Sequence, residues 1–385
     1  MTVRTTSFTA LLGGALSALL SWSAHAGYAV NTLAAPDASR DSYGELVNAQ
    51  GTSLGEVYVQ QSCPVSQWMT CLVDGYAPRQ PRSAWWSGTG GPPTLLQCLS
   101  DKVSPTTSWD KPCQAEGINA RGVMVGRSYA PKGAFDVQTR PVLWLSADSR
   151  PVDLSAQMQG LPAYASARAV GINDQGWVLG RAQAIGNGAG EYAFLLRDGL
   201  ASLLPTGGAL SVKAKAINAT MAVGEGQFDR GGPSGVIAWT LGGPTSTLRT
   251  IDGTENYVYA EGLSSAGHVA GFYWAPASKQ GNRAYVWYQG RAQALPTDAG
   301  YSSVAYGVNA AGQVAGSHCR TDQDIHGCRA VVWTNGVRQD LNTLAAPPAG
   351  YTFVQAKSIN DQGRIVGWMV NGNKVYRGFL LTPRF

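Results

Sequence analysis

The chain has 385 residues, of which 14% are charged, and its 29 basic and 24 acidic residues give a formal net charge of +5. These charges are scattered singly, without the basic run or stripe that nucleic-acid binding needs, so the sequence argues against a nucleic-acid partner. The 48 glycines and the scarcity of helix-favouring runs predict many short strands joined by tight turns. The 12 tryptophans and 16 tyrosines argue against disorder, because disordered segments are poor in aromatic residues.

The first 26 residues have the features of a secretory signal peptide. Arg4 provides a positive start, an apolar run ends at Leu20, and Ala24 and Ala26 are the small residues that a signal peptidase needs. The apolar run is shorter than the roughly 20 residues of a membrane-spanning helix, although a retained N-terminal anchor is the alternative. No later segment is long and apolar enough to span a bilayer. We therefore expect an exported protein, periplasmic or secreted, with residues 27–385 as one domain.

One pattern recurs seven times after this segment: Asn, two variable residues, Gly, a short apolar run and a second Gly. The copies begin at Asn48, Asn119, Asn173, Asn218 (a shortened copy), Ser264, Asn309 and Asn360. Most spacings between successive copies are close to 46 residues, which fits a four-stranded propeller blade and is too long for one coil of a β-solenoid. We interpret the repeated asparagines as turn residues, with a ligand-binding ring as the alternative.

Each repeat divides into four strands, called a to d in chain order. The asparagine turn joins strands a and b, and a second tight turn, such as Asp198-Gly199 or Asn335-Gly336, joins strands c and d. The tryptophans that end strand c are interpreted as packing between blades: Trp144, Trp239, Trp287 and Trp333. The predicted repeats lie near residues 42–75, 113–154, 167–204, 212–251, 258–295, 304–344 and 354–385, with an insertion at 76–112.

The two ends of the chain complement each other. Residues 31–36 and 342–347 share the sequence Asn-Thr-Leu-Ala-Ala-Pro, and the second copy lies in the predicted strand d of the sixth repeat. The seventh repeat stops after strand c, so residues 28–36 can supply its missing strand d, and a closed ring leaves no exposed edges. The sequence therefore predicts an all-β, seven-bladed β-propeller of four-stranded blades, closed by the N-terminal strand.

The third strands carry triplets that resemble the HAF-type extracellular repeat, a bacterial family named for a His-Ala-Phe sequence. The corresponding triplets here are Tyr192-Ala193-Phe194, Arg283-Ala284-Tyr285, Arg329-Ala330-Val331 and Arg377-Gly378-Phe379. The resemblance covers residues from about 117 to the C-terminus. It implies an exported bacterial repeat protein and brings no catalytic residues.

Six cysteines in an exported chain predict three disulfides, with free thiols or a metal site as the alternative. Two pairs lie between strands b and c of the first and sixth repeats, and the third pair lies in the insertion. The predicted disulfides are Cys63–Cys71, Cys98–Cys113 and Cys319–Cys328.

One segment of the sixth repeat has metal-like character. Asp322, Asp324 and His326 alternate between two cysteines, and oxygen ligands at this spacing suit Ca²⁺. The segment lacks the third carboxylate and the glutamate of an EF-hand loop, so a solvated, disulfide-tied loop is the alternative. No other cofactor is indicated.

Binding sites usually lie on variable loops of a rigid scaffold. The b–c and d–a connections vary in length and emerge on the same side of a four-stranded blade, here called the loop face. The aromatic residues expected there are Trp85, Trp86, Tyr273, Trp274 and Trp368 as ligand contacts, with Tyr129, Phe135, Phe228 and Trp109. Such rings stack on sugars or hold a peptide, whereas the alternative is that they fold back and cap the blades.

The sequence contains no nucleophile elbow, zinc-protease helix or phosphate loop. We therefore predict a binding module for a glycan, peptide or protein partner, without catalytic residues. Two alternatives stay open: a glycosidase or lyase with its site at the central channel, and a structural envelope-associated protein. Two carboxylates a few ångströms apart at the channel would favour the enzyme, and an aromatic surface would favour binding.

Overall fold

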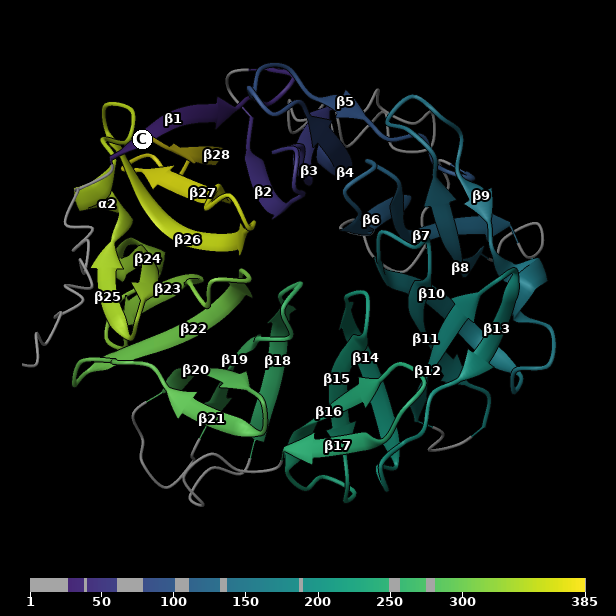
Figure 1. The fold of residues 1–385 in the computed structure, drawn as a ribbon. Helices are drawn as coiled ribbons and strands as arrows, with labels where there is room; N and C mark the ends of the chain where they lie inside the picture. The colour runs from purple at the N-terminus through teal and green to yellow at the C-terminus, as the bar shows by residue number, and fades with distance from the viewer. Residues whose placement is uncertain are drawn as a thin grey trace, which may run out of the picture.

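The computed structural model describes residues 27–37, 40–60, 79–100, 111–131, 137–186, 190–248, 257–274 and 281–384. The predicted signal peptide lies outside these residues. Short antiparallel sheets dominate the structure, and they are arranged around a common centre (Figure 1). In the part of the chain that is described, no helix has the length and apolar character needed to cross a membrane.

Consecutive strands a to d of each repeat form an antiparallel sheet in which strand a is innermost (Figure 1). Repeats 1 to 3 contain β2 (Ser42–Val47), β3 (Ser53–Gln60), β4 (Arg79–Trp86) and β5 (Thr94–Leu95); β6 (Cys113–Ile118), β7 (Met124–Pro131), β8 (Val137–Trp144) and β9 (Val152–Asp153); and β10 (Tyr164–Ile172), β11 (Val178–Ala184), β12 (Glu191–Arg197) and β13 (Leu200–Leu203). Repeats 4 and 5 contain β14 (Ser211–Ile217), β15 (Met221–Gln227), β16 (Ser234–Thr240) and β17 (Thr245–Leu248); and β18 (Tyr257–Leu263), β19 (Val269–Trp274), β20 (Asn282–Tyr288) and β21 (Arg291–Ala294).

Repeat 6 contains β22 (Tyr301–Val308), β23 (Val314–Arg320), β24 (Cys328–Thr334) and β25 (Val337–Asp340), and repeat 7 contains β26 (Tyr351–Ile359), β27 (Ile365–Asn371) and β28 (Tyr376–Pro383). The strands of repeats 4 and 5 form one eight-stranded sheet, because β16 and β18 are bridged by a single parallel residue pair, Ser234 and Tyr257.

The N-terminal strand β1 (Tyr28–Leu33) supplies the fourth strand of repeat 7. It pairs antiparallel with β28 over its whole length, from Tyr28 opposite Pro383 to Leu33 opposite Gly378. The indole nitrogen of Trp86 donates a hydrogen bond to the carbonyl of Ala34, just after β1 (2.9 Å). Equivalent indole bonds run from Trp144 to Gln97, from Trp239 to Pro205 and from Trp333 to Pro296, each just after a fourth strand. The chain directly after β1 therefore accepts the same tryptophan hydrogen bond as the chain directly after the fourth strands of other repeats.

The repeated hexapeptide adopts two different structures, which corrects one prediction. Residues 31–33 lie in β1, but the predicted strand d of repeat 6 ends at Asp340, and Leu341–Leu344 form the short helix α2. Asp340 caps this turn by accepting a hydrogen bond from Asn342 N (2.9 Å), and the Asn342 amide bonds to both backbone groups of Phe353. The first copy has no such cap and instead lies along the open edge of β28.

The predicted layout of the first repeat is also wrong. Residues 79–86, assigned to the insertion, form strand β4, so strand c comes later than expected. The pattern of a small residue followed by aromatic ones is present at Ala84-Trp85-Trp86, but the polar residues before it conceal the strand. Ala84 and Trp86 are fully buried, as the strand-c positions of the other repeats require.

The repeated asparagines are buried turn residues that also link neighbouring repeats. Each Asn side-chain oxygen accepts hydrogen bonds from backbone N–H groups within its own turn, for example from Gln175 and Trp177 to Asn173 (3.1 and 2.9 Å). Each side-chain amide donates to the carbonyl of the first turn residue of the next repeat, at 2.8–3.2 Å. Ser264 replaces Asn in repeat 5, and its hydroxyl bonds within its own turn, accepting from His268 N (3.0 Å) and lying 3.2 Å from His268 Nδ1. These amides are occupied within the fold, which agrees with the structural interpretation.

Candidate functional site

Each innermost strand carries a β-bulge at the same place. The pairing between strands a and b skips one residue, which lies three positions before the first residue of the asparagine turn. These bulge residues are Glu45, Glu116, Val170, Lys215, Glu261, Tyr306 and Lys357. A bulge redirects a side chain away from the regular alternation of the strand. Here it presents one side chain per repeat to the centre.

The second glycine of the repeat makes the bulge possible. A Cβ on Gly55 would lie 1.8 Å from the Tyr43 carbonyl oxygen, and one on Gly367 would lie 1.9 Å from the Gln355 carbonyl oxygen. Only a residue without a side chain permits so close an approach of strand a to strand b. The glycine that appeared in the sequence as a strand residue therefore positions the central side chains.

All seven bulge residues line a central cavity of about 510 Å³. A second cavity of about 270 Å³ lies on the side of the asparagine turns. The two cavities share a ring of aliphatic side chains, each directly before a turn: Val47, Ile118, Ile172, Ile217, Leu263, Val308 and Ile359. The larger cavity is therefore polar and lies toward the loop face, whereas its floor is apolar.

The acidic and basic groups around the larger cavity pair with one another, often between neighbouring repeats. Lys357 of repeat 7 is 3.4 Å from Glu45 of repeat 1 and 4.1 Å from the centre of the Tyr306 ring. Lys215 of repeat 4 contacts Glu225 at 3.1 Å and Glu261 of repeat 5 at 3.6 Å. Glu225 and Glu261 thus share one ammonium group.

Burial shifts the pKa values of these groups. Loss of hydration raises the pKa of Glu45 despite the attraction of Lys357, and it raises that of Glu225 despite Lys215. Burial is the largest influence on the pKa of Lys357 and would lower it, but the combined attraction of Glu45, Tyr306 and Glu261 outweighs burial and the pKa is raised. Lys357 therefore stays charged, while Glu45 and Glu225 take up a proton more readily than carboxyl groups in water.

Four aromatic rings form a grid on β18 and β19, above the cavity on the loop face. Tyr257 is directly opposite Trp274, and Tyr259 is directly opposite Phe272. The Tyr259 and Phe272 rings are stacked at 4.7 Å, and the Tyr257 and Trp274 ring centres are 5.3 Å apart. Trp274 is 39% exposed, and the other three rings are partly exposed. We call these four residues the aromatic grid.

The five aromatic residues predicted as ligand contacts differ in their exposure. Trp274 is exposed, but its predicted companion Tyr273 is 7% exposed and belongs to the core, because successive side chains of a strand point to opposite faces. Trp86 is fully buried, which contradicts a ligand contact, and Trp85 is partly buried against the core. Trp368 is partly buried and makes edge contacts with Tyr43 and Tyr376, both at 5.5 Å.

Of the other aromatic residues expected on the loop face, Tyr129 and Phe228 are buried at 9% and 8% exposure and cap the sheets, as the alternative interpretation required. Phe135 and Trp109 lie outside the described residues.

The predicted metal ligands do not converge. Both oxygens of Asp322 accept hydrogen bonds from Arg320 (3.0 and 2.9 Å), and Asp324 accepts one from the backbone N–H of His326 (3.0 Å). No group of three or more His, Cys, Asp or Glu residues in the described ranges could hold a metal ion. The segment is a solvated loop tied by a disulfide, because its carboxylates serve a neighbouring guanidinium and a turn instead of facing one another.

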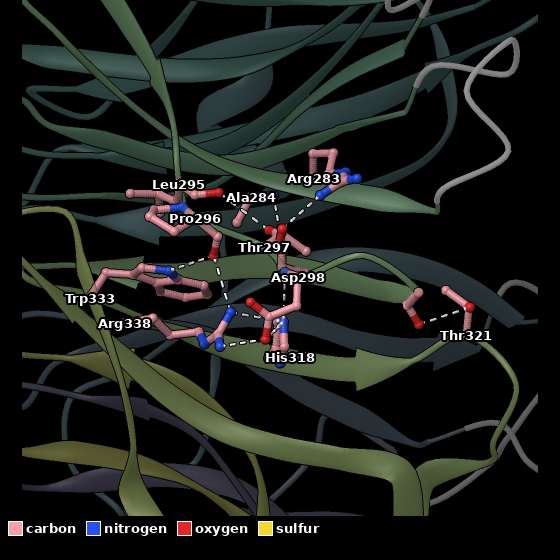
Figure 2. A network of polar contacts seen from close by, with 12 residues as sticks. Arg283, Ala284, Leu295, Pro296, Thr297, Asp298, His318, Thr321, Trp333 and Arg338 are labelled. Atoms are coloured by element: carbon pink, nitrogen blue, oxygen red, sulfur yellow. Dashed lines mark hydrogen bonds and ion pairs between the residues drawn. The ribbon is translucent and has the colours of Figure 1, made fainter.

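His318, which precedes this loop, is the buried member of a polar network between repeats 5 and 6 (Figure 2). Its Nε2 is 3.0 Å from Arg338 Nη1 and accepts a longer bond from the backbone N–H of Asp298 (3.4 Å), while its ring stacks on Tyr301 at 4.3 Å. Asp298 in turn accepts a hydrogen bond from Arg338 (2.7 Å). Burial and the charge of Arg338 lower the pKa of His318 to about 4, so the imidazole is neutral and structural.

Two of the three predicted disulfides are confirmed. Cys98 bonds to Cys113, and Cys319 bonds to Cys328 across the b–c loop of repeat 6. Cys63 and Cys71 lie outside the described residues, so their pairing stays a prediction.

Comparison with known proteins defines the fold. No protein-family model matches the chain, and no curated protein does. The β-propeller domain of the Trilobed protease from Pyrococcus furiosus is similar with a TM-score of 0.56 and 6% identity, covering 89% of this chain and 93% of that one. The chain has a β-propeller fold. The acylaminoacyl peptidase from Pyrococcus horikoshii is also similar (TM-score 0.52, 8% identity, 90% of this chain), and the propeller spans about half (52%) of its length. At these identities the likeness shows the fold alone.

The central side chains of this propeller were missed by sequence reasoning. The position three residues before the turn reads Glu, Glu, Val, Lys, Glu, Tyr, Lys through the seven repeats. Charged residues are unusual in a strand that is buried on both faces, so their presence at this position is a signal. Alignment of the repeats on their asparagines would have revealed this polar column.

Proposed function

We propose that the protein is an exported binding module that holds a glycan on the loop face of a seven-bladed propeller. The seven blades are repeats 1 to 7, with repeats 4 and 5 counted separately because one residue pair joins them. Closure by β1 is supported by its pairing with β28. The resemblance to HAF-type repeats and the two disulfides support export to an oxidising compartment.

The aromatic grid carries this proposal. Four rings on two adjacent strands form a cluster of aromatic side chains close to a polar cavity, and Trp274 at the end of β19 is its most exposed member. Sugar rings present C–H groups to aromatic faces while their hydroxyls bond to polar groups, so this combination suits a carbohydrate better than an apolar ligand.

The test is a glycan and polymer array probed with the oxidised chain of residues 27–385, followed by titration of the best binder. We expect Trp274→Ala to weaken binding at least tenfold while the melting temperature is unchanged, because the indole is exposed and borders a solvent-facing surface. Tyr288→Ala is the matched control: Tyr288 is 36% exposed and stacks on His268 beside a c–d turn, on the opposite face.

Three results would contradict the proposal. Binding that survives Trp274→Ala but is lost in Tyr288→Ala places the site on the opposite face, where the a–b and c–d turns lie. Capture of peptides but of no glycan assigns the grid to a protein partner. Release of shortened sugars from a polymer would establish the enzyme.

A further inference from the structure

Three arginines from two neighbouring blades gather beside the cavity. Arg168 on β10 and Arg181 on β11 are directly opposite each other in their strand pair. Arg127 on β7 has the same position in the preceding blade as Arg181 has in its own. Arg127 Nε and Arg168 Nη1 lie 3.7 and 3.6 Å from the same atom, Glu116 Oε1. One carboxylate therefore draws two guanidinium groups together.

The charges of this cluster do not balance. Arg181 has its nearest carboxylate in Glu191, at 3.7 Å, so three guanidinium groups share two carboxylates. Like charges directly opposite each other destabilise an antiparallel pair. Burial, together with repulsion from Arg181 and Arg127, lowers the pKa of Arg168 in spite of Glu116. The arrangement thus costs stability in the unliganded protein, and such conflicts are expected at functional sites.

The cluster also has unused hydrogen-bonding capacity. Within the described part of the chain, Arg127 Nε and Arg181 Nε are buried and donate no hydrogen bond. Arg168 is 33% exposed at its side chain, and Gln114 and Glu116 next to it line the central cavity. Arg168 is thus the most exposed of the three guanidinium groups and lies beside the cavity-lining Glu116, whereas Arg127 and Arg181 are more deeply buried.

The cluster and the aromatic grid lie in one layer of the propeller. The pair Arg168–Arg181 in blade 3 and the pair Tyr259–Phe272 in blade 5 occupy the same repeat position, five residues before and eight residues after the first turn residue. This layer is next to the bulge residues on the loop-face side. This layer is therefore basic in blade 3, at Arg168 and Arg181, and aromatic in blade 5, at Tyr259 and Phe272.

We infer that Arg127, Arg168 and Arg181 bind a carboxylate of the glycan, so that the ligand class is an acidic polysaccharide containing uronic acids. The inference rests on the proposed glycan-binding function and adds the charge of the ligand. A guanidinium pairs with a carboxylate through two parallel hydrogen bonds, which also fix its orientation. A neutral glycan would leave the repulsion between Arg168 and Arg181 unrelieved.

The experiment titrates the oxidised chain of residues 27–385 with uronate trisaccharides (galacturonate, glucuronate and mannuronate) and with their methyl esters, which keep the rings and remove the charge. We expect at least one acid to bind more than tenfold tighter than its ester, with an affinity that falls as salt is added. Arg168→Gln should abolish this preference. Glu116→Gln should strengthen binding of the acid severalfold, because Glu116 competes for the same guanidinium groups. Arg291→Gln, at an exposed outer-strand position, is the control and should change nothing.

The opposite signs expected for Arg168→Gln and Glu116→Gln separate a binding role from a structural one, because loss of a purely structural ion pair would weaken the protein in both variants alike. Equal binding of acid and ester that still depends on Trp274 overturns this inference and leaves the proposed function intact. If no uronate trisaccharide binds while a neutral glycan binds on the array, the inference is likewise overturned and the proposed function stands. Absence of any glycan binding removes the proposed function and this inference with it.

Discussion

The side-chain amide of Asn360 donates a hydrogen bond to the main-chain carbonyl of Asn48, 312 residues earlier in the sequence, at 2.8 Å. The same bond joins Asn48 to Asn119, so the last repeat is linked to the first in the way that the first is linked to the second. Asn360 also accepts bonds from Gln362 N and Arg364 N (3.1 and 2.9 Å). One buried side chain thus shapes its own turn and links repeat 7 to repeat 1.

These two roles of Asn360 can be separated by substitution. Asn360→Ala loses all three bonds and should lower the free energy of unfolding by about 2–3 kcal/mol. Asn360→Ser, which reproduces the natural Ser264, keeps a turn acceptor and should cost only about 1 kcal/mol. Denaturation midpoints in urea provide the measurement. Equal losses in the two variants would mean that the turn acceptor contributes nothing.

Removal of residues 27–36 should open the ring. The truncation deletes β1, exposes the edge of β28 and removes Leu33, which is fully buried. We expect a loss of several kcal/mol and a tendency to associate through the open edge. Leu33→Ala, which keeps the strand, should cost about 2–4 kcal/mol without association. Melting curves and light scattering test this, and a truncated chain that melts like the chain of residues 27–385 would show that β1 is dispensable.

Breaking the disulfide of repeat 6 should destabilise the protein moderately. Cys319 and Cys328 are nine residues apart, and closure of so short a loop contributes at most about 3 kcal/mol in the loop-entropy model. Cys319→Ser/Cys328→Ser should therefore lower the free energy of unfolding by about 2 kcal/mol. Peptide mapping under non-reducing conditions should find this pair, the pair Cys98–Cys113, and the predicted pair Cys63–Cys71. A peptide that joins Cys63 to Cys98 would disprove the map.

His318 should make the protein sensitive to acid. Its pKa in the folded protein is about 4, below the value of roughly 6.5 for an unfolded chain, so on acidification the unfolded chain takes up the proton first. The stability that neutral His318 contributes is present above about pH 6.5 and is lost as the pH falls toward 4. His318→Gln keeps an acceptor for Arg338 and does not titrate.

The measurement compares urea denaturation of the two proteins at pH 7.5 and pH 4.5. Between these values the original protein should lose about 2–3 kcal/mol more than His318→Gln, because the other titrating groups are common to both. Parallel losses in the two proteins would mean that His318 titrates normally in the fold.

The sequence by itself determined the local and periodic features of this protein. The recurring turn residues, the spacing near 46 residues, the buried strand-c residues Trp144, Trp239 and Trp333 (Trp287 is only partly buried) and the pairing of Cys319 with Cys328 depend on short-range geometry. The pairing of the N-terminal strand with β28 was predictable because one strand was missing at the C-terminus and one was in excess at the N-terminus. Trp274 is exposed, as a ligand contact would require, but its predicted companion Tyr273 is buried.

Tertiary structure decided the rest. A Trp-Trp or Tyr-Trp sequence does not reveal which of the two side chains faces the core, because this depends on how the strand packs between its neighbours. The sequence Asn-Thr-Leu-Ala-Ala-Pro forms a strand beside β28 and a helical turn after Asp340, because the available partner and cap differ. Arg127, Arg168 and Glu116 come from strands of two repeats, and only the packing of one blade against the next brings their charges within 4 Å.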